Sequence, residues 1–362
     1  MEYYECYAAT YSRARAKFLR VASAAGGTVR SHLHPERTTP DGEPLAIDVA
    51  CFGGASAPRR ALIISGTHGQ EGFSGSAVQI GWMAQRGPER LPGDVGAVLV
   101  HGLNPYGFAH LTRTTENNVD LNRNFIDRAQ EAMPANPHYE TLHQAMMLRD
   151  WTDAENARVD KALDDFRAKH GRDALFDTLA RGQYLHQDGL MYGGRDREWS
   201  NHTLERIVGE TLAAAERVAF IDWHTGIGDY GKPFFLCFSE GVLFRRACDW
   251  WGKDNVDGVR PHGMERPNYT GLVFHGVQRF LGNRQLCGAV VEFGTRGGLG
   301  MRRALRLDQW LRRQNGLDPD VRTGLENDMM DAFCPFDGQW RMDTLQRGIA
   351  ITDQMIAGLT SW

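Results

Sequence analysis

Two short segments place histidine and glutamate where they could bind a metal ion. Residues 66–72, GTHGQEG, carry His68 and Glu71 three positions apart in a glycine-rich turn. Imidazole nitrogen and carboxylate oxygen are good zinc ligands, and the glycines let the backbone bend until both side chains converge. Residues 222–226, DWHTG, add His224, and Asp222 could orient an imidazole from behind. His68, Glu71 and His224 are therefore candidate zinc ligands.

The His-x-x-Glu spacing of residues 68–71 does not by itself indicate a metal site, because the same spacing occurs a second time in the sequence. His202 and Glu205 repeat it within a helix-like pattern of charged residues. Charged side chains on such a face are usually solvated, so this copy predicts no site. His68 differs because it follows an apolar strand-like run, and sites in open α/β sheets gather outside the carboxyl ends of strands.

A further carboxylate closes a run of small and β-branched residues. Glu292 lies in GAVVEFGT, residues 288–295. An unpaired buried carboxylate is costly, so Glu292 must have a partner, be exposed or face a site. Three zinc ligands leave a position for water, and a nearby glutamate can take the water proton and pass it to a leaving amine. Glu292 is the predicted general base; the alternative is a salt bridge with Arg296.

A polar loop between these segments could bind an anionic substrate. It contains NPYG at 104–107, then Arg113, then NVDLNRNF at 118–125 with Arg123. Arginine binds carboxylates through two parallel hydrogen bonds, which makes this loop a candidate clamp. The alternative is that both arginines are solvated surface residues.

The elements that must position these residues alternate between short apolar runs and longer amphipathic stretches. This alternation predicts an α/β fold with a parallel or mixed central sheet. The expected strands are Leu45–Phe52, Arg60–Ser65, Val95–His101, Val218–Asp222, Phe234–Phe238, Gly271–Gly276 and Gly288–Glu292.

Two regions depart from the alternation, and we expect both to be helical. Residues 126–215 predict an insertion with helices at Asp153–Lys169 and Ser200–Arg217, and residues 301–362 predict a C-terminal extension with one helix ending at Gly316. The expected organisation is one domain over residues 1–362, with its core at about 40–125 and 216–300.

Composition narrows the class of partner. The 41 basic and 45 acidic side chains give a net charge of −4 without a basic run, so nucleic acid and anionic membranes are not expected partners. The six cysteines form no C-x-x-C pair, no stretch of 18 apolar residues occurs, and the N-terminus lacks the apolar segment of a signal peptide. These features predict reduced thiols and a cytoplasmic location.

Taken together and in order, the motifs resemble the zinc carboxypeptidase family of the carboxypeptidase A type and its deacylase relatives, aspartoacylase and succinylglutamate desuccinylase. The shared order is His-x-x-Glu, Asn-Pro-x-Gly, an arginine, Asp-Leu-Asn-Arg-Asn-Phe, a lone histidine and a late glutamate. All six elements occur here between residues 68 and 292. The resemblance implies a mixed, twisted sheet flanked by helices, which agrees with the pattern of elements.

The resemblance also implies a role for each motif residue. One zinc ion per chain would be held by His68, Glu71 and His224, with Glu292 as general base and acid. Asn122 and Arg123 would bind the substrate's free carboxylate, and Arg113 would polarise the scissile carbonyl. The family's mobile tyrosine has a candidate in Tyr269, 23 residues before Glu292, although no motif fixes it.

The function expected from the sequence is hydrolysis of an amide bond beside a free carboxylate, in a small peptide or an N-acyl amino acid. The choice between carboxypeptidase and deacylase stays open, because the two differ only in the group on the acyl side. A serine hydrolase is a weaker alternative, since Gly72–Ser76 lacks the final glycine of a nucleophile elbow. A non-catalytic binding protein on this fold would not need Glu292.

Overall fold

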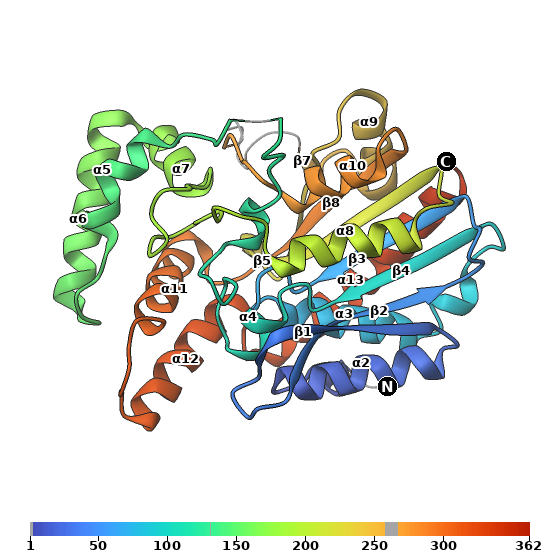
Figure 1. Cartoon of the computed structure of the whole chain (residues 1–362), viewed down its shortest axis with the longest axis horizontal. Coiled ribbons are helices and arrows are strands. Elements are labelled where there is room, and N and C mark those ends of the chain that lie inside the picture. Colours follow the sequence, from blue (N-terminus) through green and yellow to red (C-terminus); the bar gives the residue numbers. More distant parts are fainter. Residues whose placement is uncertain (1–2, 131, 258–266) are drawn as a thin grey trace.

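The computed structural model describes residues 3–130, 132–257 and 267–362. In this part of the chain an eight-stranded sheet forms the centre, in the order β1-β2-β4-β3-β5-β8-β6-β7 (Figure 1). The strands are β1 (Thr28–Thr38), β2 (Pro44–Phe52), β3 (Arg59–Ser65), β4 (Val95–His101), β5 (Arg217–Tyr230), β6 (Pro233–Leu236), β7 (Val256–Asp257) and β8 (Gln285–Gly294). Strands β4, β3, β5 and β8 are parallel, whereas β1, β2 and β6 pair antiparallel with their inner neighbours. The predicted α/β fold with a mixed sheet is confirmed.

Helices cover both faces of this sheet. They are α1 (Tyr3–Cys6), α2 (Tyr11–Ala24), α3 (Gly72–Ala84), η1 (Pro88–Arg90), α4 (Pro105–Ala109), η2 (Leu121–Arg123), α5 (Pro137–Met146), α6 (Asp153–His170), α7 (Arg172–Ala180), α8 (Trp199–Thr211), α9 (Gly241–Trp251), α10 (Val273–Leu281), α11 (Gly297–Leu311), α12 (Pro319–Phe333) and α13 (Gly338–Thr360). Helices α2, α3, α9 and α13 pack on one face around Phe18, Trp82 and Trp340. Helices α8 and α10 pack on the other face through Leu204 and Phe274. In the described residues no helix is both long and apolar enough to cross a membrane.

A third apolar cluster lies beyond one end of the sheet. There α5, α6 and α7 pack against α11 and α12 around Tyr139, Phe166 and Phe333 (Figure 1). The predicted insertion and the predicted C-terminal extension therefore contact each other. Helix α8 belongs to neither group, because its apolar side packs on the sheet although it falls within residues 126–215. The one-domain organisation stays a prediction.

One predicted strand is wrong. Residues 271–276 contain the start of helix α10, which begins at Val273, and form no strand. Val273, Phe274, Val277 and Leu281 all face the core, and this spacing follows the helical period although the run is short. The side chain of Asn122 accepts a hydrogen bond from the amide of Val273 at 2.9 Å, which satisfies one of the free N–H groups at the helix start.

Other elements of the structure also differ from those predicted from the sequence. Strand β1 was not predicted, because it is an edge strand with a mostly exposed, polar sequence. The helix predicted at Ser200–Arg217 ends at Thr211, since Arg217 already begins the buried strand β5. The helix expected to end at Gly316 ends at Leu311.

The pairing of β5 with β8 generates the first prediction. Gly288 lies opposite Phe220, and a Cβ at Gly288 would meet the carbonyl oxygen of Phe220 at 2.0 Å. We expect Gly288→Ala to lower the free energy of unfolding by about 1–3 kcal/mol, because neither backbone can move away. The matched control is Gly209→Ala in the exposed part of α8, where a Cβ meets nothing within 4 Å. It should raise the free energy of unfolding by up to about 1 kcal/mol. Equal effects of the two changes in chemical denaturation would contradict this account.

Candidate metal centre

Three adjacent parallel strands bring the candidate residues together. In the register of the sheet, Ser65 of β3 lies beside Trp223 of β5, and His224 lies beside Glu292 of β8. His68 and Glu71 follow β3 in the turn that leads into α3. This turn passes so close to α4 that a Cβ on Gly69 would meet the backbone of Gly107 at 2.0 Å. The sheet edge and this tight turn therefore position every candidate ligand.

The three predicted ligands converge on one point in the interior. His68 Nδ1 lies 2.9 Å from Glu71 Oε1, and His224 Nδ1 lies 3.0 Å from Glu71 Oε2. The two Nδ1 atoms are 3.1 Å apart, and all three side chains are buried. Two imidazoles and one carboxylate are the ligand set of several catalytic zinc sites.

Buried carboxylates stand behind both imidazoles. Asp120 Oδ1 lies 3.0 Å from His68 Nε2. Asp222 Oδ2 lies 2.9 Å from His224 Nε2, in ion-pair contact but without the angle of a straight hydrogen bond. If both Nε2 atoms carry the proton, both Nδ1 atoms present lone pairs toward each other and toward Glu71. The lone pairs of these nitrogen and oxygen atoms repel one another unless a cation lies between them. These three side chains therefore fit the ligands of a zinc ion.

The ionisation of the cluster agrees with this view. Burial would lower the pKa of His224, but the charges of Asp222 and Glu71 outweigh burial and hold it well above its usual range. Burial would raise the pKa of Glu71, but the adjoining His68 and His224 lower it. In the chain without a metal ion, a proton on His224 thus provides positive charge beside the carboxylates of Asp222 and Glu71.

Glu292 lies beside the ligands but outside their triangle. Its carboxylate is buried and accepts a long hydrogen bond of 3.4 Å from the amide of Ile227. Burial raises its pKa to about 7, and the neighbouring charge of Glu71 adds to the rise. The alternative partner Arg296 instead binds Asp331, at 2.7 and 2.9 Å. Glu292 therefore forms no direct ion pair among the described residues, but its charge interacts with those of Glu71, His224 and Arg113, which puts it beside the candidate centre.

Arg113 contacts the centre directly. Its Nη1 donates to Glu71 Oε1 at 2.9 Å, and its Nε donates to Asp120 Oδ2 at 3.3 Å. Burial lowers the pKa of an arginine, but Asp120 and Glu71 outweigh burial, so Arg113 keeps its charge. A fixed positive charge thus adjoins the three converging ligands.

The structure brings the other three predicted residues together as well. The guanidinium of Arg123 is buried, donates to the carbonyl oxygens of Ala180 and Asn122, and lies 5.1 Å from the ring centroid of Tyr269. Three of its five N–H groups are thus bonded, and among the described residues it forms no ion pair with a carboxylate. The amide oxygen of Asn122 is used by Val273, which leaves its NH₂ group as the available donor.

Two residues that support the candidate centre could not be identified from the sequence, and the structure excludes the alternative serine site. Asp120 lay inside a recognised motif, yet the sequence could not reveal that it faces His68 across 52 positions. Thr67, which donates to both oxygens of Asp222 at 2.8 and 3.0 Å, carried no signal of its own. The serines of the incomplete nucleophile elbow are buried in α3, with Ser76 on His101 and Ser74 on Cys334, so no substrate reaches them.

The family of the chain follows from its sequence match. A family model described as DUF2817, protein of unknown function, matches residues 7–347. The chain belongs to this family. No curated protein matches this DUF2817 chain significantly in sequence.

Several solved structures are similar in fold to this DUF2817 chain. Bovine thrombin-activatable fibrinolysis inhibitor, solved in complex with a tick carboxypeptidase inhibitor, aligns over 99% of both chains with 11% identity and a TM-score of 0.50. Carboxypeptidase A from Helicoverpa armigera covers 94% of this chain and 73% of its own, with 13% identity and a TM-score of 0.44. Succinylglutamate desuccinylase from Chromobacterium violaceum covers 88% and 74%, with 15% identity and a TM-score of 0.39. The first alignment carries the argument, and it bears on the fold alone.

The buried carboxylate behind His224 generates the second prediction. Asp222→Asn keeps the shape of the side chain but removes the charge that orients the imidazole. We expect zinc affinity, measured by competition with a chelator, to fall by about 10–100-fold. The control is Asp229→Asn on the same strand, whose exposed carboxylate pairs only with Lys232 in the described structure. Unchanged affinity in Asp222→Asn would show that this carboxylate does not support the ligand.

Proposed function

We propose that this chain is a zinc-dependent hydrolase that cleaves an amide bond beside a free carboxylate. One zinc ion per chain would be held by His68, Glu71 and His224. The observation that carries this proposal is the convergence of their ligand atoms, 2.9–3.1 Å apart, next to Glu292. When bound, zinc supplies Lewis acidity, which acidifies water and polarises a carbonyl group.

Glu292 moves the proton in this proposal. It takes a proton from the attacking water and returns it to the nitrogen of the leaving amine. Its pKa of about 7 in the metal-free chain, raised by burial, is compatible with both steps near neutral pH. Its place beside His224 in the sheet register keeps the carboxylate on a rigid strand.

The two arginines would bind different negative charges during the reaction. Arg113 adjoins the ligands and would donate to the oxyanion that forms from the scissile carbonyl, in addition to holding Glu71 and Asp120. Arg123 and the NH₂ group of Asn122 would bind the carboxylate that the substrate already carries. A buried guanidinium without an ion-pair partner in the described structure supports this assignment, because a substrate carboxylate would supply the missing charge. Tyr269 beside Arg123 would border the same subsite.

The third prediction tests the proton carrier. Glu292→Gln keeps the shape of the side chain and removes its ability to accept a proton. We expect kcat to fall by about 10²–10⁴-fold while zinc remains bound. The matched control is Glu198→Gln, because Glu198 is also a buried carboxylate whose pKa is raised by burial, but it contacts Asn117 and no ligand. Turnover near the wild-type rate in Glu292→Gln would assign Glu292 a structural role.

The fourth prediction tests the substrate class. Short peptides and N-acyl amino acids would be compared with analogues whose free carboxylate is capped as an amide. For the zinc-loaded wild type we expect capping to lower kcat/KM by about 10- to 100-fold, since hydrogen bonds to a charged group contribute about 1.5–3 kcal/mol. Arg123→Ala should lose most of this discrimination.

A control separates recognition from folding. Arg128 lies in the same loop and donates to the backbone carbonyls of residues 124 and 193–195, much as Arg123 donates to backbone carbonyls. Arg128→Ala should keep the wild-type preference for the free carboxylate. If capping affects wild type and Arg123→Ala equally, Arg123 does not bind the carboxylate and this part of the proposal is wrong.

A further inference from the structure

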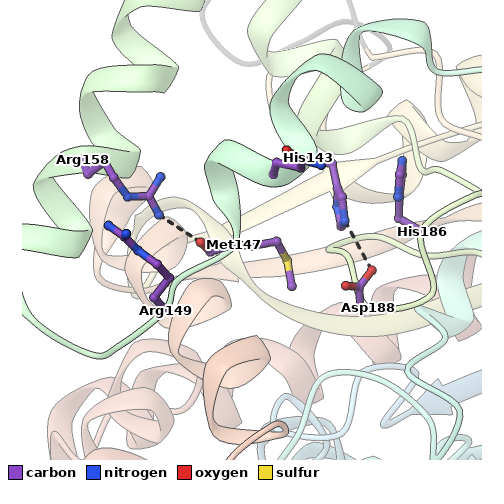
Figure 2. A pocket seen from close by; sticks show the side chains of 7 residues that line it. His143, Met147, Arg149, Arg158, His186 and Asp188 are labelled. Carbon is purple, nitrogen blue, oxygen red and sulfur yellow. Dashed lines mark hydrogen bonds and ion pairs between the residues drawn. The ribbon is translucent and has the colours of Figure 1, made fainter.

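A second group of histidines and carboxylates lies outside the candidate centre. His143 comes from α5, and His186 and Asp188 come from the loop that follows α7 (Figure 2). They border a cavity of about 700 Å³ that is also lined by Gln144, Met147, Arg149 and Arg158. One ligand atom from each of the three residues lies within 4.8 Å of the others.

The loop that carries two of these side chains is held firmly by amide groups. The side chain of Gln183 accepts from the amides of Leu185 and His186 and donates to the carbonyl of His186. Asn118 donates to the carbonyls of residues 187 and 189, and Gln309 donates to that of Asp188. These contacts fix the backbone at residues 185–189, so the Cα positions of His186 and Asp188 are set while their side chains can still turn.

The geometry of the closest pair fits two ligands of one cation. His143 Nε2 points toward Asp188 in Figure 2 and lies 3.3 Å from its Oδ1. A direct charge-assisted hydrogen bond is shorter, about 2.7–2.9 Å. Two zinc ligands with bonds of about 2.0–2.1 Å at a tetrahedral angle are separated by about 3.3–3.4 Å.

His143 also has an unsatisfied nitrogen. Its side chain is 9% exposed, and its Nδ1 has no hydrogen-bond partner in the described part of the chain. No hydrogen bond at Nδ1 therefore fixes the tautomer, and the nitrogen that faces the carboxylate of Asp188 and the cavity is Nε2, where a cation would take the place of a proton. Burial, together with the adjacent His186, lowers the pKa of His143, which favours the neutral imidazole that binds metals.

We propose that His143, His186 and Asp188 bind a divalent transition-metal cation at a site separate from the candidate centre. Two imidazoles and one carboxylate suit zinc, nickel or copper, and the open cavity leaves room for water ligands. Glu140, whose Oε1 lies 3.0 Å from His186 Nε2, would support His186 through its second nitrogen.

Binding requires one side chain to move. The rings of His143 and His186 are stacked, with centroids 3.8 Å apart and planes inclined by 18°. Their in-plane lone pairs therefore run nearly parallel and do not meet at one point. His186 is the residue that turns, because its side chain is 29% exposed whereas that of His143 is buried.

The test is the number of metal ions bound per chain, measured by equilibrium dialysis of the full-length protein against zinc and, separately, nickel. We expect two ions for wild type and one for His186→Ala and for Asp188→Asn. Both variants change exposed or half-exposed side chains, so folding should persist. The matched control is His202→Ala, because His202 and Glu205 have ligand-like spacing on an exposed helix face but no site. It should keep two ions.

The outcomes separate this site from the candidate centre. A wild type that binds one ion, lost in a Glu71→Ala variant and kept in His186→Ala, overturns the second site and leaves the proposed function intact. Two ions in His186→Ala would also overturn it. One ion lost in His186→Ala but kept in Glu71→Ala would instead support this site and contradict the proposed catalytic centre.

Discussion

The Nδ1 atoms of His68 and His224 face each other at 3.1 Å, and each also lies against an oxygen of Glu71. In a buried, low-dielectric environment such a group of acceptors is stable only with a cation or a proton between them. The surrounding structure is organised around this constraint. Asp120 and Asp222 hold the far nitrogens, and Thr67 in turn holds Asp222.

The C-terminal helices also bind the loops that carry the centre. Asp308 of α11 accepts hydrogen bonds from Thr112 Oγ1 at 2.7 Å and from the amide of Arg113 at 2.8 Å. The last turn of α12 accepts the hydroxyl of Thr225, the residue after His224, through the carbonyl of Phe333 at 2.5 Å. A segment that looks like an appendage in the sequence therefore helps to fix Arg113 and His224. Because α11 and α12 also pack on α5–α7, the insertion is connected to the centre through them.

Much of the fold and the candidate site could be predicted because the strands and motifs concerned have clear local sequence patterns. Strands β3 and β4 are almost completely buried, so they read as continuous apolar runs, and the motif residues follow such runs. Strand β1 gave no such signal, because an exposed edge strand buries little. The strand predicted at residues 271–276 is wrong because a short apolar run fits helix and strand equally. The helix start is instead stabilised by the side chain of Asn122, 151 positions away, which accepts from the amide of Val273. Long-range pairs of this kind, including Asp120 with His68, have no local signature. The roles assigned to the site residues stay predictions.

The most direct test of the central claim is X-ray absorption at the zinc edge of the protein loaded with one equivalent of zinc. We expect a first shell of two imidazole nitrogens and carboxylate or water oxygens at about 2.0–2.2 Å. The signal of one imidazole should disappear in His224→Ala. This variant should still fold, because residue 224 lies on β5, which is paired with β3 and β8. A sulfur ligand, or a spectrum that His224→Ala leaves unchanged, would contradict the account.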